Sequence, residues 1–146
     1  MSAESVTTPN HRLFCYGSLR IPEVIRAVIG RKPECRPAAL PDHALRRIRN
    51  ATYPGVTSLS GARTPGCLYE WLSLDDLEKL DAFEGEPYSR EIRTVRLENS
   101  AETAAWVYLL PANRLDWLSE ESWDLETFRR NDLTDFMRRC FSVKDD

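Results

Sequence analysis

Apolar residues recur at helical spacing in three stretches of the chain. Between residues 21 and 29 they fall at i, i+3, i+4, i+7 and i+8, which predicts a short amphipathic helix. Pro22 suits the first turn of that helix and Gly30 its C-terminal end. Residues 73–76 resemble a capping box and predict a second helix to about Phe83. The third stretch predicts a C-terminal helix over residues 133–141.

The segments between these helices have the composition of strands and loops. The predicted strands cover residues 12–16, 36–50, 66–72, 88–98 and 104–110. Residues 53–65 are rich in Gly, Ser, Thr and Pro and therefore predict a loop. Within 88–98 the apolar positions change face between Thr94 and Val95, which predicts a β-bulge. Residues 104–110 are apolar on both faces, as in a central strand that is covered on both sides.

Strands thus outnumber helices, and no two predicted strands are joined by a two-residue hairpin turn. This arrangement favours an α+β fold, with one curved mixed sheet flanked by two to three helices. A chain of 146 residues suits one domain with a substantial core. We expect the polar residues 1–10 to form a loose N-terminal segment and residues 11–146 to form the domain.

Charge and composition restrict the partners that we expect. The net charge of −3 does not favour nucleic acid or an anionic membrane surface. The N-terminus has no basic region followed by an apolar one, so we expect no secretory signal. No apolar run approaches the roughly 18–20 residues that span a membrane. We therefore expect a cytoplasmic protein.

The cysteines and histidines restrict the chemistry further. The chain has no Cys-x-x-Cys motif, so we expect reduced thiols that mostly pack as small apolar side chains: Cys15, Cys35, Cys67 and Cys140. His11 and His43 are the only histidines, which argues against a histidine-based metal site or a Ser-His-Asp triad. We expect no metal site.

The first candidate site is the motif Tyr16-Gly17-Ser18-Leu19, at the end of the first predicted strand. Successive backbone N–H groups in such a turn form a concave nest for an anion, and glycine lets a ligand approach the backbone. The alternative is an ordinary turn from strand to helix, because Gly and Ser are common in turns. Gly17 and the shape of the turn matter more here than the side chains.

The second candidate is Glu84, which comes directly before Gly85 where the second predicted helix should end. A carboxylate is unfavourable there, because the C-terminus of a helix already carries partial negative charge. The alternative is a solvated surface glutamate, the usual state of this residue type. Glu86 stands in the following turn, before Pro87, and we expect it to be exposed.

These motifs, taken in order, resemble the gamma-glutamylcyclotransferase-like family and its AIG2-like branch. That family opens with a strand ending in Tyr-Gly-Ser/Thr-Leu, here Tyr16 to Leu19. It later carries Leu-Asp-x-Phe-Glu-Gly and a Tyr-x-Arg strand, here residues 80–85 and 88–90. The order and spacing fit over residues 13–108 and loosely to the C-terminus. The resemblance implies a small β-barrel flanked by helices, with the site at one mouth of the barrel.

The resemblance also implies an activity: release of 5-oxoproline and a free amine from a γ-glutamyl amine, peptide or conjugate. Glu84 matches the family's catalytic carboxylate and would act as general acid/base. The 16–19 turn would bind the α-carboxylate of the substrate. Such a reaction requires no metal and no cofactor, and the implied partner is a small γ-glutamyl molecule. The alternative is a non-catalytic binding or regulatory protein that holds a carboxylate ligand or a partner peptide in the same pocket.

Aromatic and basic residues complete the set of candidates. Tyr88 and Tyr108 lie on elements that converge in the resembled fold, so they are candidates for lining the pocket and donating hydrogen bonds to the substrate. The alternative is that they pack as ordinary aromatic residues in the core or at the rim. This alternative is favoured for Tyr53. The basic segment 46–49 suggests a solvated strand more than a site for an acidic substrate. We expect the tryptophans to pack in the core and against helices: Trp71, Trp106, Trp117 and Trp123.

Overall fold

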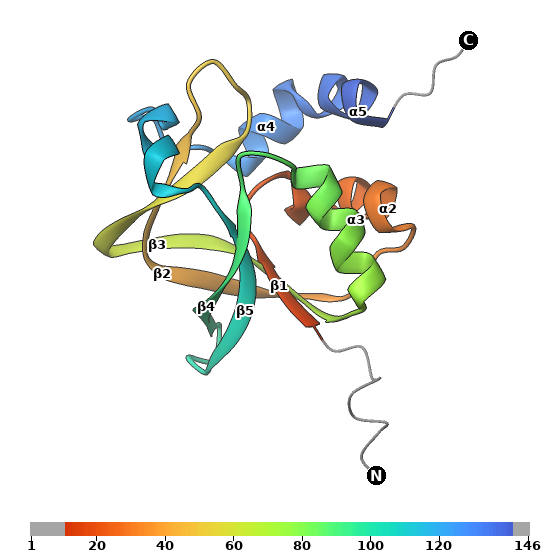
Figure 1. The fold of residues 1–146 in the computed structure, drawn as a ribbon, viewed down its shortest axis with the longest axis horizontal. Coiled ribbons are helices and arrows are strands. Elements are labelled where there is room, and N and C mark those ends of the chain that lie inside the picture. Colours follow the sequence, from red (N-terminus) through yellow and green to blue (C-terminus); the bar gives the residue numbers. More distant parts are fainter. Residues whose placement is uncertain (1–10, 142–146) are drawn as a thin grey trace.

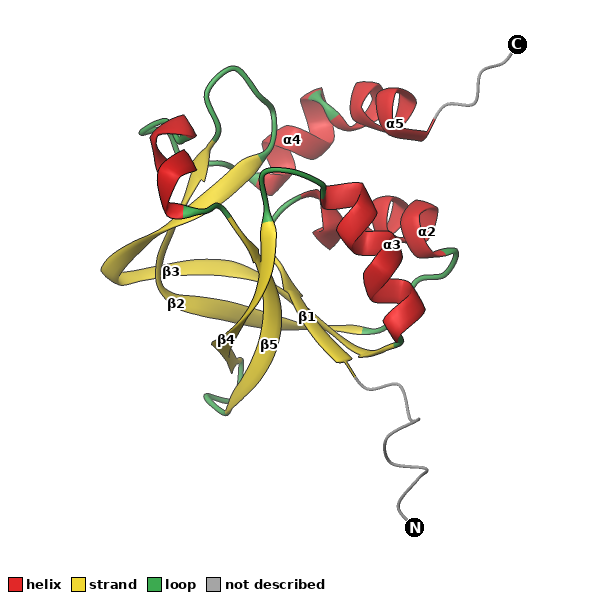
Figure 2. Ribbon diagram, viewed as in Figure 1, coloured by secondary structure: helices red, strands yellow, loops and turns green. Residues whose placement is uncertain are grey.

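A computed structural model describes residues 11–141, which form a closed barrel of five strands with helices packed outside it (Figures 1 and 2). The elements follow in the order β1 (His11–Cys15), the 3-10 helix η1 (Ser18–Arg20), α2 (Pro22–Ile29), β2 (Cys35–Arg47), β3 (Pro54–Leu72), α3 (Leu74–Glu84), β4 (Ser89–Leu97), β5 (Glu102–Leu109), the 3-10 helix η2 (Ala112–Trp117), α4 (Leu125–Asn131) and α5 (Leu133–Phe141). The α+β barrel expected from the sequence is confirmed. The expectation for residues 1–10 lies outside the described residues.

The strand order around the barrel is β1-β3-β2-β4-β5, and β5 closes the barrel against β1. The pair β1–β5 is parallel, whereas the other neighbouring strands are antiparallel. The sheet is therefore mixed, as predicted. Because β1 and β5 are parallel, their C-terminal ends lie side by side. The segments that follow these two ends both contribute to the candidate site described below.

Alternate residues of the strands belong to two separate apolar cores. Phe14, Leu68 and Val107 belong to the core that fills the barrel. Their neighbours, such as Leu13 and Tyr108, pack instead in the core beneath the helices. This explains why β1 and β5 are apolar on both faces, and it confirms the prediction of a doubly covered strand at residues 104–110.

The helices begin and end at the predicted signals. Pro22 occupies the first turn of α2, and Gly30 ends it in the left-handed conformation with φ 86°. At α3 the hydroxyl of Ser73 accepts from the N–H of Asp76, and the carboxylate of Asp76 accepts from the N–H of Ser73, so the capping box is confirmed. Helix α4 was not predicted: its sequence is mostly polar and buries only Phe128.

Two predictions about the strands are wrong. Residues 53–65 are not a loop, because β3 begins at Pro54 and pairs with β2 on both sides of an irregularity between Ser58 and Arg63. Much of this part of β3 is exposed, so backbone pairing rather than side-chain burial stabilises it, which is why its composition resembles that of a loop. The bulge predicted in 88–98 is also absent: the pairing of β4 with β5 is continuous, and the apolar residue left outside, Ile92, is 49% exposed.

The expectations for cysteines and tryptophans hold in part. Cys15 and Cys67 are buried, whereas Cys35 and Cys140 are exposed; all are free thiols. Trp123 is buried in the helix-covered core, as expected. The expectation is wrong for Trp71 and Trp117, which are 58% and 42% exposed. Among residues 11–141 no helix is long and apolar enough to cross a membrane.

Candidate active site

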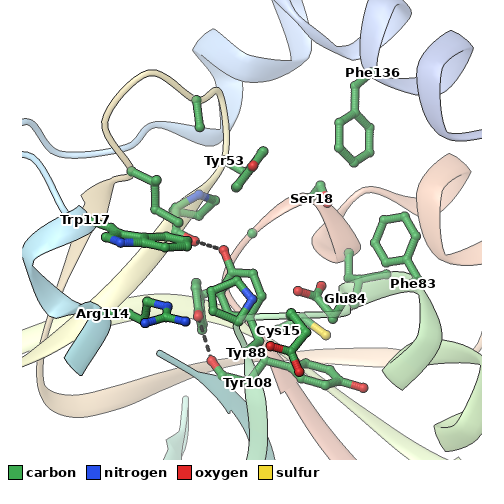
Figure 3. A pocket seen from close by; sticks show the side chains of 18 of the residues that line it. Cys15, Ser18, Tyr53, Phe83, Glu84, Tyr88, Tyr108, Arg114, Trp117 and Phe136 are labelled. Carbon is green, nitrogen blue, oxygen red and sulfur yellow. Dashed lines mark hydrogen bonds between the residues drawn. The ribbon is translucent and has the colours of Figure 1, made fainter. Parts of the chain in front are cut away.

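A cavity of about 750 Å³ lies where β1 ends and β3 begins (Figure 3). Its volume falls in the range of about 300–1,000 Å³ that is typical of small-molecule sites. The lining residues come from the 16–19 turn, the β2–β3 connection, the end of α3, the end of β5, η2 and α5. The structure therefore brings all the predicted site residues to one cavity: Tyr16, Gly17, Ser18, Leu19, Glu84, Tyr88 and Tyr108.

The 16–19 turn contributes free backbone donors to this cavity. The turn is closed by hydrogen bonds from the N–H of Arg20 to the carbonyl of Gly17 (3.0 Å) and from the N–H of Ile21 to the carbonyl of Ser18 (2.9 Å). Within the described part of the chain, the N–H groups of Gly17, Ser18 and Leu19 have no acceptor. Such a run of unpaired N–H groups can bind an anion.

Gly17 also packs closely against a neighbour in the fold, Pro54. A Cβ at this position would lie 3.2 Å from Cγ and 3.3 Å from Cδ of Pro54, which is tighter than normal packing. Its φ of −117° is ordinary. Glycine therefore allows a close approach to Pro54 at the start of β3, in addition to any approach by a ligand.

Glu84 is the last residue of α3, and Gly85 turns the chain away immediately after it. The N–H of Gly85 donates to the carbonyl of Asp81 (2.9 Å), and its φ of 61° with ψ of −168° is a conformation almost restricted to glycine. Glu84 is partly buried, and no hydrogen bond or ion pair joins its carboxyl to another of residues 11–141. Burial raises the pKa of Glu84 from 4.5 to about 7. Its carboxyl can therefore both accept and release a proton near neutral pH.

Glu86 lines the same cavity but is exposed, as predicted. It lies beyond Gly85, in the turn before β4. The two glutamates are therefore in different environments although they are only two residues apart.

The hydroxyl groups of the site tyrosines already donate hydrogen bonds within the protein. Tyr16 donates to the carbonyl of Tyr108 (2.6 Å), and Tyr88 donates to the carbonyl of Pro54 (2.7 Å). Tyr108 donates to the carboxylate of Asp81 (2.7 Å). Each hydroxyl keeps the capacity to accept a hydrogen bond, but its proton is used. These residues thus present rigid aromatic walls to the cavity, while Tyr53 lies 41% exposed at its rim.

Asp81 is a residue of the site region that we did not single out from the sequence. Its carboxylate accepts from Nε (2.7 Å) and Nη2 (3.0 Å) of Arg90, in addition to the Tyr108 hydroxyl. Partial burial by itself would raise the pKa of Asp81, but the hydrogen bonds from Arg90 and Tyr108 outweigh it and hold the pKa below its usual value. Asp81 precedes Glu84 by about one helical turn, so this cluster fixes the end of α3 against β4 and β5.

The thiol of Cys15, which lines the cavity, is unsuited to catalysis. Burial raises the pKa of the Cys15 thiol well above its usual value, so this thiol is not a nucleophile at neutral pH. In the described part of the chain, no three His, Cys, Asp or Glu side chains are grouped closely enough to hold a metal ion.

The basic segment 46–49 has divided roles. Arg46 and Arg47 contact the backbone of Glu120 and the carboxylate of Glu121, so they connect β2 to the segment after η2. Arg49 lines the cavity and is exposed. A second arginine, Arg114 on η2, lines the cavity as well and was not predicted from the sequence.

Comparison with known proteins is consistent with this geometry. Residues 13–125 match the family described as gamma-glutamyl cyclotransferase, AIG2-like. The chain belongs to this family. AIG2-like protein A of Arabidopsis thaliana is 32% identical to it over 121 residues, which cover 82% of this chain and 73% of that protein.

Solved structures share the fold. A solution structure of another Arabidopsis thaliana protein superposes with a TM-score of 0.69 at 29% identity, and covers 90% of this chain and 88% of that one. A structure named gamma-glutamyl cyclotransferase superposes with a TM-score of 0.63 at 19% identity, and covers 70% of this chain and 67% of that one. The second likeness shows the common fold.

Proposed function

We propose that this protein is a cyclotransferase that acts on a γ-glutamyl amine, peptide or conjugate and releases 5-oxoproline and the free amine. The observation that carries the proposal is Glu84, a partly buried carboxyl without an ion pair among residues 11–141, in one cavity with the free N–H groups of the 16–19 turn. Membership of the family supports it. The partner would be a small molecule, and the site of action the cytoplasm, where free thiols stay reduced.

The reaction is an intramolecular acyl transfer. The α-amine of the glutamyl group attacks the γ-carbonyl carbon, and a new C–N bond closes a five-membered ring. Glu84 accepts the proton that the attacking amine loses and then delivers it to the leaving nitrogen as the old C–N bond breaks. The proton is returned, so the carboxylate is regenerated and no water is consumed.

The other residues of the cavity would position the substrate. The N–H groups of Gly17, Ser18 and Leu19 would bind the α-carboxylate, which fixes the attached α-amine next to Glu84. The aromatic walls formed by Tyr88 and Tyr108 would favour the folded form of the substrate and limit the access of water. Positioning of this kind contributes much of the rate enhancement of a ring closure.

The test is release of 5-oxoproline from a panel of γ-glutamyl amides and peptides. Glu84→Gln keeps the size of the side chain but cannot transfer a proton, so we expect its rate to fall by about 10²–10⁴-fold. Glu86→Gln is the matched control in the same cavity, and its rate should stay close to that of the wild type. Full activity of Glu84→Gln would exclude Glu84 as the proton-transfer group.

The panel also distinguishes the alternative of a binding protein. If the wild type releases no 5-oxoproline but binds a γ-glutamyl compound or another carboxylate in calorimetric titrations, the cavity holds a ligand without reaction. In that case Glu84 would serve as an anion that binds the amine of the ligand.

A further inference from the structure

Tyr69 of β3 connects the core beneath the helices to the 16–19 turn. Its side chain is buried, and it lies opposite Leu13 of β1 and Cys35 of β2, so the strands on both sides hold it in place. Its hydroxyl donates to the carbonyl of Leu19 (2.6 Å), 50 residues away in the chain. Burial raises the pKa of Tyr69 above its usual value, so this hydroxyl keeps its proton and remains a donor.

The carbonyl groups of the turn determine whether its N–H groups can face the cavity. A peptide unit is planar and trans, so its N–H and C=O point in opposite directions. The carbonyls of Gly17 and Ser18 accept hydrogen bonds from N–H groups three residues later, within the turn itself. The carbonyl of Leu19 has no such local partner, because among residues 11–141 only the hydroxyl of Tyr69 donates to it. The turn therefore fixes its first two carbonyls by itself, and β3 fixes the third.

An unpaired Leu19 carbonyl would weaken an anion site at this turn. Leu19 is buried, so water does not readily replace the Tyr69 hydroxyl, and a buried acceptor without a partner is unfavourable. The peptide unit would gain access to a new partner by turning toward the cavity, which Leu19 also lines. Its oxygen would then direct partial negative charge at the ligand, where the N–H groups of the turn direct partial positive charge.

We propose that Tyr69 is a positioning residue for the anion site of the cavity. It does not line the cavity itself, so it acts only through the carbonyl of Leu19 and the orientation of the turn. This inference rests on the role that the proposed function gives to the turn, which is to bind a carboxylate. The effect of Tyr69 is then confined to ligands that carry this carboxylate.

The binding test uses Tyr69→Phe, which keeps the apolar ring in the core and removes only the hydroxyl. The two probes are 5-oxoproline and pyrrolidin-2-one, which is the same ring without the carboxylate. In calorimetric titrations we expect the variant to bind 5-oxoproline about 3–10-fold more weakly than the wild type, the usual effect of losing one hydrogen bond. Pyrrolidin-2-one should not distinguish the two proteins.

The kinetic test separates positioning from chemistry. The turn holds the carboxylate equally in the ground state and in the transition state, so its disturbance removes uniform binding. For a γ-glutamyl substrate that the wild type accepts, Tyr69→Phe should therefore raise KM by about 3–10-fold and change kcat by less than about twofold.

Thr64→Val is the matched control. Thr64 is also buried on β3, its hydroxyl donates to the carbonyl of His43 (2.8 Å), and it does not line the cavity. Both variants thus lose one hydrogen bond from a buried hydroxyl to a backbone carbonyl. Both should lower the melting temperature by a few degrees, but only Tyr69→Phe should change KM and the affinity for 5-oxoproline.

The outcomes distinguish this inference from the proposed function. If Tyr69→Phe loses thermal stability as Thr64→Val does but keeps the wild-type affinity and KM, its role is merely structural and the inference is wrong. An equal loss of affinity for both probes would also overturn it. If the wild type binds 5-oxoproline but releases none from the panel, the proposed reaction fails, and the titrations still decide the role of Tyr69. If the wild type turns over substrate but binds its product too weakly to measure, KM decides. A wild type that neither binds nor releases 5-oxoproline would remove both proposals.

Discussion

Replacement of Glu84 by Gln should make the protein more stable in alkaline solution although it removes activity. The wild type must desolvate a carboxyl at the end of α3, where the helix dipole is also unfavourable to negative charge. Glutamine occupies the same volume and carries no charge. The substitution therefore relieves an unfavourable interaction that exists only when Glu84 is ionised.

The sign and the magnitude follow from the two pKa values. Burial raises the pKa of Glu84 from 4.5 to about 7, so the folded protein binds this proton more tightly than the unfolded chain. The proton on Glu84 therefore stabilises the folded protein fully below pH 4.5, and this stabilisation is lost as the pH rises to about 7. A difference of about 2.5 pH units at about 1.4 kcal/mol each sets an upper limit of about 3.5 kcal/mol. Because the carboxyl is only partly buried, we expect about 1–3 kcal/mol.

The assay is urea denaturation of the wild type and Glu84→Gln between pH 5 and 8.5, with the free energy of unfolding extrapolated to water. The two proteins should differ little at pH 5, and the variant should be more stable at pH 8.5. The exposed Glu86 supplies the control, since Glu86→Gln should follow the wild type across the whole range. Parallel curves for the wild type and Glu84→Gln would refute the assignment of a raised pKa to this carboxyl.

Two further changes test how the end of α3 is held. Asp81→Asn should lower the free energy of unfolding at pH 7 by about 1–2 kcal/mol, because it weakens the paired hydrogen bonds from Arg90. Denaturation at several pH values should show this difference shrinking only as the pH falls below 3.8, the usual pKa of the group, and through the lower pKa of Asp81 in the folded protein. An unchanged stability at pH 7 would mean that the Arg90 contact is not formed in solution. Gly85→Ala should lower the free energy of unfolding by about 1–3 kcal/mol, since alanine does not readily adopt φ 61° and ψ −168°. It should also reduce 5-oxoproline release, because Glu84 would move. A variant with wild-type melting and activity would contradict this geometry.

The local features of the site could be predicted from the sequence. A glycine at a strand end indicated the 16–19 turn, and a carboxylate placed against the helix dipole indicated Glu84. Both signals lie within a few residues of the chain. The structure brings these residues together and leaves their roles to the experiments proposed above.

The long-range features could not be predicted in this way. Asp81 acquires its contacts through Arg90 and Tyr108, which lie on two other elements, and Arg114 lines the cavity only because distant segments of the chain form it. The error at residues 53–65 has a similar cause. Strand preference depends on the neighbouring strand, and β2 supplies the backbone partners that the Gly-rich and Ser-rich sequence of β3 does not reveal.

The origin of the cavity lining gives the site a property of practical use. The residues that form it extend from Phe14 in β1 to Cys140 in α5, so the cavity exists only when nearly all of residues 11–141 are folded. A molecule that occupies it binds the native state and not the unfolded chain, and this raises the melting temperature by mass action. At a hundredfold excess over its dissociation constant, a ligand stabilises the fold by about 2.7 kcal/mol. A melting-temperature screen can therefore identify the natural ligand before any reaction has been observed.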